Sequence, residues 1–332
     1  MAQTYHVRDT ILLIVARFVD CGLPTVKEDV YRPTDKSSSA RQLTYEQTTT
    51  FRSRSKGDKL LASINININY HKTTPTKLKM IADSKTIVLV TGANQGIGFE
   101  TAKKLTTEHK DYHVIMAGRR KEAVEQAASK LQAEGLSVEP LVLDVTSDES
   151  ITQAVKTVSD RHGHLDVLIN NAAIGNAPKS ADGKPLSIRE EFLRILDTNV
   201  AGVQAVTDAF IPLLEKSDRT KRIVFLSSSL GSVSSKADPA LGFPFRTMEG
   251  AWHYTTSKAA FNMLALHYVI RYEGRADWKL NISCPGYCST NLNSYEGTNP
   301  PEHGAINVCR LATLGPDGES GTFSDKDGVV PW

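Results

Sequence analysis

The stretch that decides the fold of this chain is TGANQGIG, residues 91–98. The run before it, residues 86–90, is β-branched and aliphatic, which predicts a strand buried on both faces of a parallel sheet. The run after it, residues 99–105, has the composition of a helix start. A strand, a glycine turn and a helix in this order aim backbone N–H groups at one point, so the stretch predicts a phosphate-binding turn.

The three glycines of this turn have separate roles. Gly92 permits the tight turn, Gly96 lets a pyrophosphate approach the backbone, and Gly98 lets the helix pack closely on the strand. Their spacing is G-x-x-x-G-x-G rather than the more common G-x-G-x-x-G, so an ordinary glycine turn is the alternative. The flanking strand and helix favour dinucleotide binding. The expected contacts in the turn are Gly92, Asn94, Gln95, Gly96, Ile97 and Gly98.

From residue 86 onward, strand and helix patterns alternate. Ser147 is expected to cap a helix that ends at Gly163. The alternation predicts an α/β fold: a single doubly wound parallel sheet of the Rossmann type with helices on both faces, whose ligands bind beyond the carboxyl ends of the strands. Strands are predicted at residues 86–90, 113–117, 141–145, 165–171, 222–228 and 280–285, and further helices at 121–134, 147–161, 188–215 and 254–274.

Residues 1–79 differ from the remainder of the chain. They are rich in Ser, Thr and basic residues, show no sustained period, and contain the low-complexity run INININ at residues 64–69. A mitochondrial transit peptide is an alternative, but the acidic residues before residue 30 count against it. We therefore predict a disordered extension over residues 1–79 and one domain over residues 80–332, with the functional protein beginning near Met80.

The whole-chain composition argues against several classes of protein. The net charge of +2 gives no reason to expect nucleic acid or an anionic membrane as a partner. No apolar run approaches the roughly 20 residues that a membrane-spanning helix needs. The four cysteines form no C-x-x-C pair and are interpreted as buried thiols, which indicates a reducing, cytoplasmic location.

No metal site is predicted. Cys284 and Cys288 lack the second spaced pair that accompanies such cysteines in zinc sites. His162 and His164, with Asp160 nearby, could suggest a metal, but the sequence there is more typical of a polar loop at a helix end.

Tyr254 and Lys258, four positions apart, are the strongest candidates for acid–base chemistry, because on a helix they share one face. A free tyrosine has a pKa near 10, and a lysine ammonium within about 4–6 Å lowers that pKa by favouring the phenolate. Ser228, at the end of a predicted strand, can hydrogen-bond a carbonyl oxygen and stabilise the charge that develops there. A Tyr–Lys pair at this spacing also occurs by chance. The pair supports a catalytic site only because it follows the glycine turn and the serine in this order along the chain.

From about residue 87 to the end, the chain resembles the short-chain dehydrogenase/reductase family. The matching motifs, in chain order, are TGxxxGIG at 91–98, LDV at 143–145, NNAA at 170–173, TN at 198–199, SS at 227–228, YxxxK at 254–258 and PG at 285–286. Ala173 replaces the glycine that is usual at its position. Within the family, the sequences LQAEGL at 131–136, CPGY at 284–287 and residues 321–332 are most similar to the carbonyl-reductase branch.

The resemblance assigns a role to each catalytic candidate. Tyr254 is the proton donor, and Lys258 lowers its pKa and binds the nicotinamide ribose. Ser228 positions the substrate carbonyl, with Ser227 as the fallback. Asn199 holds a water in a proton relay through Lys258.

The same resemblance implies further cofactor contacts. Asp144 and Val145 contact the adenine, and Asn171 contacts the adjoining ribose. Thr290 contacts the carboxamide or a phosphate, whereas Asn170 is interpreted as structural.

The end of the second strand indicates which cofactor is used. NAD-specific enzymes of this type place an acidic residue there to bind the ribose 2′-OH. This chain has Gly118 followed by Arg119 and Arg120, and a guanidinium can bind a 2′-phosphate in two-pronged fashion. NADPH is therefore predicted, with Arg119 as its contact. Two points count against this: Gln95 stands where many NADP-using relatives have a basic residue, and Arg119 could be a solvated surface charge.

Together these features predict NADPH-dependent reduction of a ketone, aldehyde or quinone. The alternatives are an NAD-dependent alcohol dehydrogenase and a non-catalytic dinucleotide sensor, although a sensor has no need for the intact Ser, Tyr and Lys. The stretch between Ser228 and Tyr254, which contains Phe243 and Trp252, is expected to line an apolar substrate pocket together with Tyr287 and the loop 291–301. The alternative is that Phe243 and Trp252 only form loop core. The expected partner is a small-molecule carbonyl compound, with no nucleic acid and no membrane, and the sequence leaves a monomer and a homo-oligomer equally open.

Overall fold

The computed structural model describes residues 48–50, 63–65, 85–176 and 185–332. The chain divides into two units, residues 1–81 and 82–332. In the first unit, β1 (Thr48–Thr50) pairs antiparallel with β2 (Ser63–Asn65). The disordered extension expected over residues 1–79 otherwise falls outside the described residues.

Seven strands form one parallel sheet in the second unit, in the order β5-β4-β3-β6-β7-β8-β9. The predicted doubly wound parallel sheet is therefore confirmed. The strands are β3 (Thr86–Thr91), β4 (Tyr112–Gly118), β5 (Val138–Val142), β6 (Val167–Asn170), β7 (Lys221–Leu226), β8 (Trp278–Ser283) and β9 (Phe323–Ser324).

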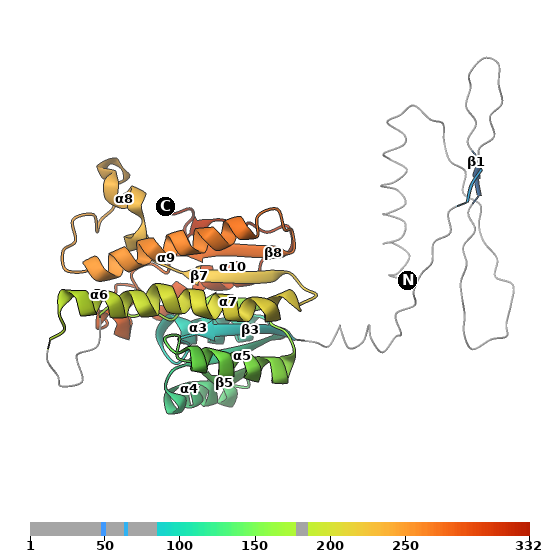
Figure 1. Cartoon of the computed structure of the whole chain (residues 1–332), viewed down its shortest axis with the longest axis horizontal. Coiled ribbons are helices and arrows are strands. Elements are labelled where there is room, and N and C mark those ends of the chain that lie inside the picture. Colours follow the sequence, from blue (N-terminus) through green and yellow to red (C-terminus); the bar gives the residue numbers. More distant parts are fainter. Residues whose placement is uncertain (1–47, 51–62, 66–84, 177–184) are drawn as a thin grey trace, which may run out of the picture. The chain divides into compact units, whose positions relative to one another are not determined.

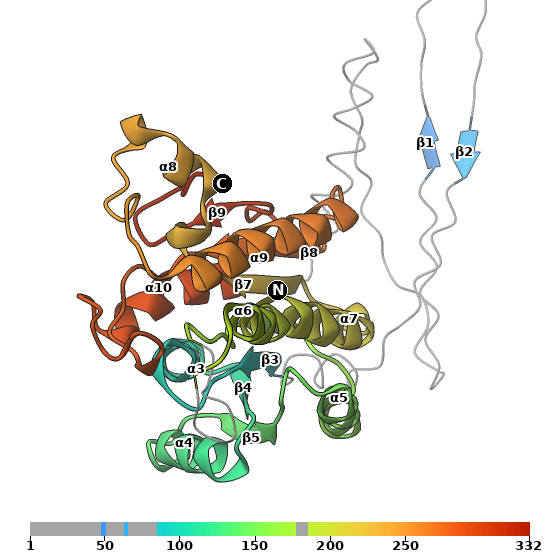
Figure 2. The same ribbon diagram turned by 60° about the vertical axis from the view of Figure 1, so that its left-hand side comes forward.

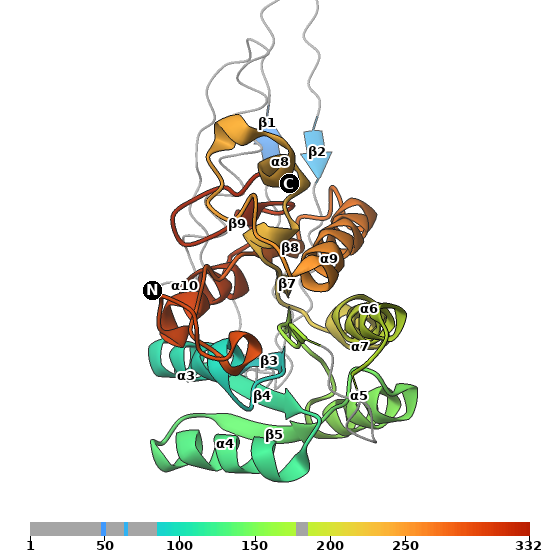
Figure 3. The same ribbon diagram turned by 90° about the vertical axis from the view of Figure 1, so that its left-hand side faces the viewer.

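Helices cover both faces of this sheet (Figures 1 and 2). Figure 3 shows α3, α4 and α10 on one face, and α5, α6, α7 and α9 on the other. In the described part of the chain, no helix combines the length and the apolar character that a bilayer crossing requires. The α-helices are α3 (Gly96–Glu108), α4 (Lys121–Ala133), α5 (Asp148–His162), α6 (Ile188–Leu196), α7 (Gly202–Glu215), α8 (Val233–Ala237), α9 (Trp252–Arg271) and α10 (Pro301–Ala312).

The burial of β3 explains why its apolar run is uninterrupted. Ile87 and Leu89 belong to the core on the side of α5, α7 and α9, whereas Val88 and Val90 belong to the core on the side of α3, α4 and α10. Successive side chains of a strand point to opposite faces, so a strand covered on both sides needs apolar residues at every position.

The position predicted for the third strand is wrong by three residues. The prediction followed the apolar residues 141–145, but β5 spans Val138–Val142 and pairs Glu139 with Ile115 of β4. β5 is the edge strand of the sheet. An edge strand has one side without a ladder partner and tolerates Pro140, which made this segment look unlike a strand.

The helix predicted over residues 188–215 is not a continuous α-helix. A π-helical turn, η1 (Asp197–Ala201), separates α6 from α7. The predicted ends of α5 are confirmed: the Ser147 side chain accepts a hydrogen bond from the Ser150 N–H at 3.2 Å, and Gly163 has a φ of 77°. The helices α8 and α10 and the strand β9 were not predicted.

Candidate active site

Loops from four neighbouring strands meet beyond the carboxyl edge of the sheet. The glycine turn follows β3, Asn171 follows β6, Ser227 and Ser228 follow β7, and Pro285 follows β8. These strands are adjacent and parallel, so the loops that leave them lie at one edge. The predicted site residues that belong to these loops are therefore brought together.

The glycine turn has the geometry of a phosphate cradle. Gly92 and Gly96 have φ angles of 65° and 56°, in the left-handed region that favours glycine. α3 begins at Gly96, earlier than predicted, and its N-cap Gln95 makes no side-chain capping hydrogen bond. The first turn of α3 contains no acidic residue. Its N–H groups and the positive end of the helix dipole are therefore available to an anion.

Asn171 holds this turn in place. Its Nδ2 donates to the carbonyl oxygens of Thr91 at 2.7 Å and Gly92 at 3.1 Å, and its backbone N–H donates to Thr91 Oγ1 at 3.0 Å. The residue predicted to contact a ribose thus also supports the turn. Asn170 Nδ2 donates to Thr207 Oγ1 at 2.9 Å and so ties β6 to α7, in agreement with its structural interpretation.

Replacing Gly98 by alanine is expected to damage the turn. The added methyl group would lie 2.5 Å from Asn171 Nδ2 and 2.7 Å from the Gly92 carbonyl oxygen. We expect the free energy of unfolding to fall by about 1–3 kcal/mol and the predicted cofactor, NADPH, to bind at least about tenfold more weakly. Urea unfolding and fluorescence titration with NADPH measure the two effects. Gly315→Ala is the matched control, because nothing lies within 4 Å of its added methyl group; an equal effect of the two substitutions would contradict the steric argument.

Tyr254 and Lys258 lie one turn apart near the start of α9. The Lys258 side chain is buried, and its Nζ donates to the Leu226 carbonyl oxygen at 2.9 Å. The same Nζ lies 5.8 Å from the centre of the Tyr254 ring and 4.5 Å from that of Phe261. The two side chains therefore share a face of the helix, as predicted.

The pKa of Tyr254 shifts in the opposite direction to the one predicted. Burial raises it above its ordinary value, the neighbouring Cys284 adds to the rise, and a hydrogen bond with Ser228 opposes it. Burial also lowers the pKa of Lys258 to about 7. The expected lowering of the phenol pKa assumed a fully charged ammonium, but burial disfavours the charged forms of both groups. At neutral pH the phenol therefore keeps its proton.

The structure distinguishes the adjacent serines. Ser227 is buried, and its hydroxyl donates to Asn262 Oδ1. Ser228 is half-buried, accepts a hydrogen bond from the Leu230 N–H at 3.2 Å, and bonds to the Tyr254 phenol. Ser228, rather than Ser227, is therefore the serine beside the phenol.

Asn199 lies in the π-helical turn η1 and is fully buried. Its Nδ2 donates to the Ile174 carbonyl oxygen at 2.9 Å and to Ser257 Oγ at 3.0 Å, and its Oδ1 accepts from the Ile174 N–H at 2.9 Å. Ser257 Oγ in turn donates to the Tyr254 carbonyl oxygen at 2.7 Å. Both amide hydrogens of Asn199 therefore tie the loop after β6 to the helix that carries Tyr254.

Arg119 follows β4 directly and is exposed. No hydrogen bond or ion pair with the described residues holds its guanidinium. A methyl group at the neighbouring Gly118 would lie 3.2 Å from Asn94 Oδ1, so Asn94 lies beside the end of β4 because Gly118 has no side chain. The structure thus brings Asn94 and Arg119 to the same strand end.

The remaining predicted contacts lie around this edge. Asp144 Oδ1 accepts hydrogen bonds from the Thr146 N–H at 3.0 Å and its Oγ1 at 2.7 Å. Val145 is 9% exposed, and its side chain belongs to the core between β5 and α7. Thr290 Cγ2 lies 3.4 Å from the position that a Cβ of Gly96 would take, so Thr290 is beside the glycine turn.

Three residues of this region were not predicted. Ser257 links Asn199 to Tyr254, as described above. Asn262 accepts from Ser227 and donates through Nδ2 to the Gly231 carbonyl oxygen at 3.3 Å. Cys284, interpreted only as a buried thiol, accepts a hydrogen bond from the Ser229 N–H at 3.2 Å and raises the pKa of Tyr254. These roles depend on contacts across the fold, for which the sequence carries no signal.

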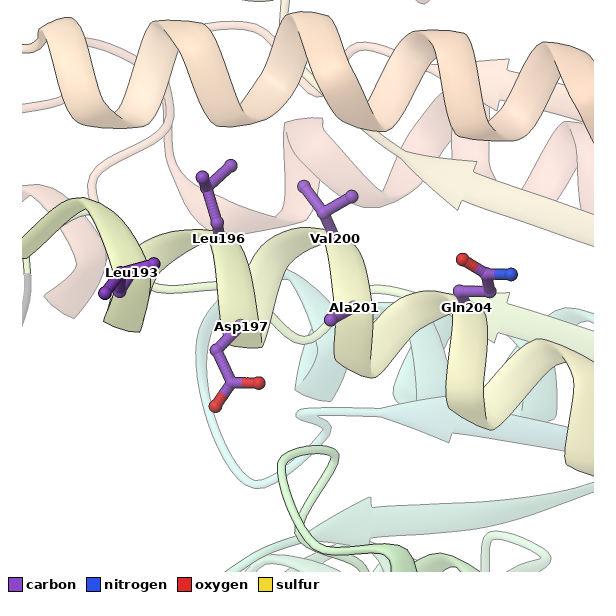
Figure 4. Close-up of a pocket in the computed structure, with 6 residues that line it drawn as sticks. All are labelled: Leu193, Leu196, Asp197, Val200, Ala201 and Gln204. Atoms are coloured by element: carbon purple, nitrogen blue, oxygen red, sulfur yellow. The ribbon is translucent and has the colours of Figure 1, made fainter.

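A groove of about 430 Å³ is lined by residues of α6, η1 and α7. Figure 4 shows Leu196 and Val200 pointing toward α9 and Asp197 pointing away from it. None of the predicted site residues lines the groove. Its lining consists of Leu193, Leu196, Asp197, Val200, Ala201 and Gln204.

Comparison with known proteins identifies the family. The model for short chain dehydrogenases matches residues 86–300. The short-chain dehydrogenase anuI of Penicillium roqueforti is 37% identical over 238 residues, which cover 71% of this chain and 92% of that protein. The NADPH carbonyl reductase 1 of Mus musculus is 30% identical over 282 residues, covering 76% of this chain and 100% of that protein. The structure of NADPH-bound carbonyl reductase from chicken fatty liver has a TM-score of 0.61 at 26% identity, covering 75% of this chain and 100% of that one.

The chain therefore belongs to the short-chain dehydrogenase/reductase family, and the predicted similarity to carbonyl reductases is confirmed. Members of this family are oxidoreductases that bind a nicotinamide dinucleotide. The residues present fit such a cofactor, because the N-terminus of α3 has no capping side chain and the backbone at Gly96 is open, with only Thr290 near the position of an added Cβ.

Proposed function

We propose that this protein is an NADPH-dependent reductase of a carbonyl compound, a ketone, an aldehyde or a quinone. The observation that carries the proposal is a continuous series of hydrogen bonds from the glycine turn to the Tyr254 helix. Asn171 bonds to the turn, and three residues later Ile174 bonds to Asn199. Asn199 bonds to Ser257, which bonds to the backbone of Tyr254. A dinucleotide site and a proton donor are thus held by one framework.

The residues around the phenol suit the reductive direction. When bound, the nicotinamide supplies the hydride that a carbonyl carbon accepts. Tyr254, protonated at neutral pH because burial raises its pKa, donates its proton to the carbonyl oxygen. Ser228 donates a hydrogen bond to the same oxygen and stabilises the charge that develops on it. Lys258, whose pKa burial lowers to about 7, is poised to exchange a proton near neutral pH.

The preference for NADPH over NADH follows from Arg119. Its exposed guanidinium is not bound to other described residues, and no acidic residue at the end of β4 would repel a 2′-phosphate. The mouse relative of 30% identity is named as an NADPH carbonyl reductase, which supports the same choice.

Arg119→Asp is expected to shift the cofactor preference toward NADH. Repulsion of the 2′-phosphate and loss of its guanidinium partner should raise the KM for NADPH by at least about tenfold, a loss of roughly 1.4 kcal/mol. The KM for NADH should fall or stay constant, since a carboxylate accepts a hydrogen bond from the ribose 2′-OH. Arg120→Asp is the matched control, because it makes the same charge change one residue further on and should leave the ratio of the two constants unchanged. An unchanged KM for NADPH in Arg119→Asp would refute the assignment.

Aromatic side chains after β7 and β8 favour an apolar substrate. The ring centres of Phe243 and Phe245 are 5.9 Å apart, and those of Phe245 and Tyr287 are 5.6 Å apart. This cluster joins the segment before Tyr254 to the loop after β8, beside the proposed site. NADPH oxidation measured against aromatic ketones, aldehydes, quinones and small polar carbonyls tests this: apolar substrates should have the higher kcat/KM. The buried free thiols of Cys284, Cys288 and Cys309 suit the reducing conditions of the cytoplasm, where we place the enzyme.

A further inference from the structure

A second group of titratable side chains lies at the opposite edge of the sheet from the proposed active site. His113 is the second residue of β4, Glu139 is the second residue of β5, and His162 is the last residue of α5. β4 and β5 are parallel, so their first residues lie at the amino edge. The proposed active site uses the carboxyl edge. The cluster therefore has no part in the reaction described above.

The three side chains converge on one point. His162 Nε2 lies 2.9 Å from Glu139 Oε1, and His113 Nε2 lies 3.9 Å from Glu139 Oε2. One ligand atom from each residue lies within 4.8 Å of the other two, and the centres of the two imidazole rings are 5.4 Å apart. All three residues are half-buried, with side-chain exposures of 16–22%.

The orientation of His113 suits a metal ligand. Its Nδ1 is hydrogen-bonded to Ser137 Oγ at 2.9 Å. Its Nε2 is buried and has no hydrogen-bond partner among the described residues, although it faces the Glu139 carboxylate. Metal-binding histidines characteristically use one ring nitrogen for the metal while a hydrogen bond to the other fixes the ring. An orphaned buried nitrogen of this kind is costly unless something fills the space before it.

We propose that His113, Glu139 and His162 form a binding site for a divalent transition-metal ion, with Zn²⁺ as the best-fitting ion. Two imidazole nitrogens and one carboxylate oxygen are a common zinc ligand set, and a water molecule completes the tetrahedron. Bond lengths of about 2.0–2.1 Å place neighbouring ligand atoms roughly 3.3 Å apart. The two nitrogen–oxygen separations of 2.9 Å and 3.9 Å lie on either side of this value, so small side-chain rotations bring the ligand atoms to it. The bound ion would link β4, β5 and α5 at this edge.

The guanidinium of Arg161 competes with a metal ion for the Glu139 carboxylate. Arg161 Nη1 lies 3.4 Å from Glu139 Oε2, and the Arg161 side chain is 49% exposed. Metal binding would displace this guanidinium from the carboxylate into solvent, which lowers the affinity. Arg161→Gln is therefore expected to strengthen Zn²⁺ binding. If the cluster only forms hydrogen bonds and binds no metal ion, the same substitution would not change Zn²⁺ binding.

The test is calorimetric titration of the full-length chain with ZnCl₂ at pH 7, after treatment with a chelator and dialysis. The wild type should bind one Zn²⁺ at this site and unfold at a higher temperature when it is bound. His113→Gln and Glu139→Gln should each weaken binding at least tenfold, and Arg161→Gln should tighten it. His267→Gln removes an exposed histidine of α9 and is the matched control, with no expected change.

Two results would overturn the proposal. One is the absence of saturable Zn²⁺ binding by the wild type. The other is wild-type affinity in both His113→Gln and Glu139→Gln, which would place any bound zinc elsewhere on the chain. If either variant fails to fold, the comparison of Arg161→Gln with the wild type decides, and unchanged affinity there counts against the site. NADPH-dependent turnover of the folded variants should equal that of the wild type, since the cluster lies at the other edge of the sheet.

Discussion

Tyr254→Phe is expected to lower the turnover of NADPH-dependent carbonyl reduction by about 10²–10⁴-fold, the usual contribution of a positioned general acid. The substitution removes only the phenol oxygen, so the ring still fills its half-buried place at the start of α9. NADPH should still bind, because the glycine turn, Arg119 and Lys258 are untouched. Single-turnover kinetics with an active carbonyl substrate, together with fluorescence titration of NADPH, separate the two effects.

This variant also separates the proposed reductase from a dinucleotide sensor. A sensor only needs to bind the dinucleotide, so removal of the phenol oxygen would not impair its function. Tyr272→Phe is the matched control, because it removes the same atom from a tyrosine at the other end of α9, whose hydroxyl has no hydrogen-bond partner among the described residues. Turnover that is equal in Tyr254→Phe and the wild type would refute the assignment of the proton donor, whereas loss of NADPH binding would indicate a structural effect instead.

The fold was predictable wherever one local pattern determined the element. Residues 86–90 are apolar at every position because helices cover both sides of β3, and Ser147 and Gly163 marked the ends of α5 through capping and a left-handed turn. The predicted position of β5 was wrong because its pairing with β4 determines where the strand lies. Glu139 and Pro140 are not typical strand residues, so the local sequence does not indicate a strand there. The π-helical turn η1 contains the buried Asn199, whose hydrogen-bond partners Ile174 and Ser257 lie elsewhere in the chain, so no local pattern reveals this arrangement.

The candidate site was predictable to the extent that its residues form short motifs at strand ends. The order of the glycine turn, the serines and the Tyr–Lys pair along the chain predicts that they share one edge of the sheet. The electrostatics could not be predicted in the same way. The four-residue spacing predicts that Lys258 lies close to Tyr254. It does not predict the burial that raises the pKa of the phenol instead of lowering it. The His113–Glu139–His162 cluster was missed because its members come from three elements.

Lys258→Met is expected to lower turnover by at least about 10²-fold, because it removes the group that we propose to exchange a proton beside Tyr254 and to bind the nicotinamide ribose. The same variant should be more stable than the wild type at pH 6. Burial lowers the pKa of Lys258 from 10.5 in the unfolded chain to about 7 in the folded protein. At pH 6 both states bind the proton, and the folded wild type carries the full cost of a buried charge. Relief of that cost, on the order of a few kcal/mol, should exceed the roughly 1 kcal/mol lost with the hydrogen bond to Leu226.

The sign of this difference changes with pH in a defined window. Between about pH 7 and pH 10.5 the unfolded wild type binds one more proton at Lys258 than the folded protein does, so its free energy of unfolding rises with pH. The methionine variant lacks this rise, and its advantage should therefore shrink from pH 6 to pH 9.5. Urea unfolding at both pH values measures the effect, with Lys130→Met, an exposed lysine of α4, as the control whose difference from the wild type stays constant. A stability difference between Lys258→Met and the wild type that does not change with pH would mean that Lys258 keeps its charge on folding. In that case the proposal that Lys258 exchanges a proton near neutral pH beside Tyr254 would have to be abandoned.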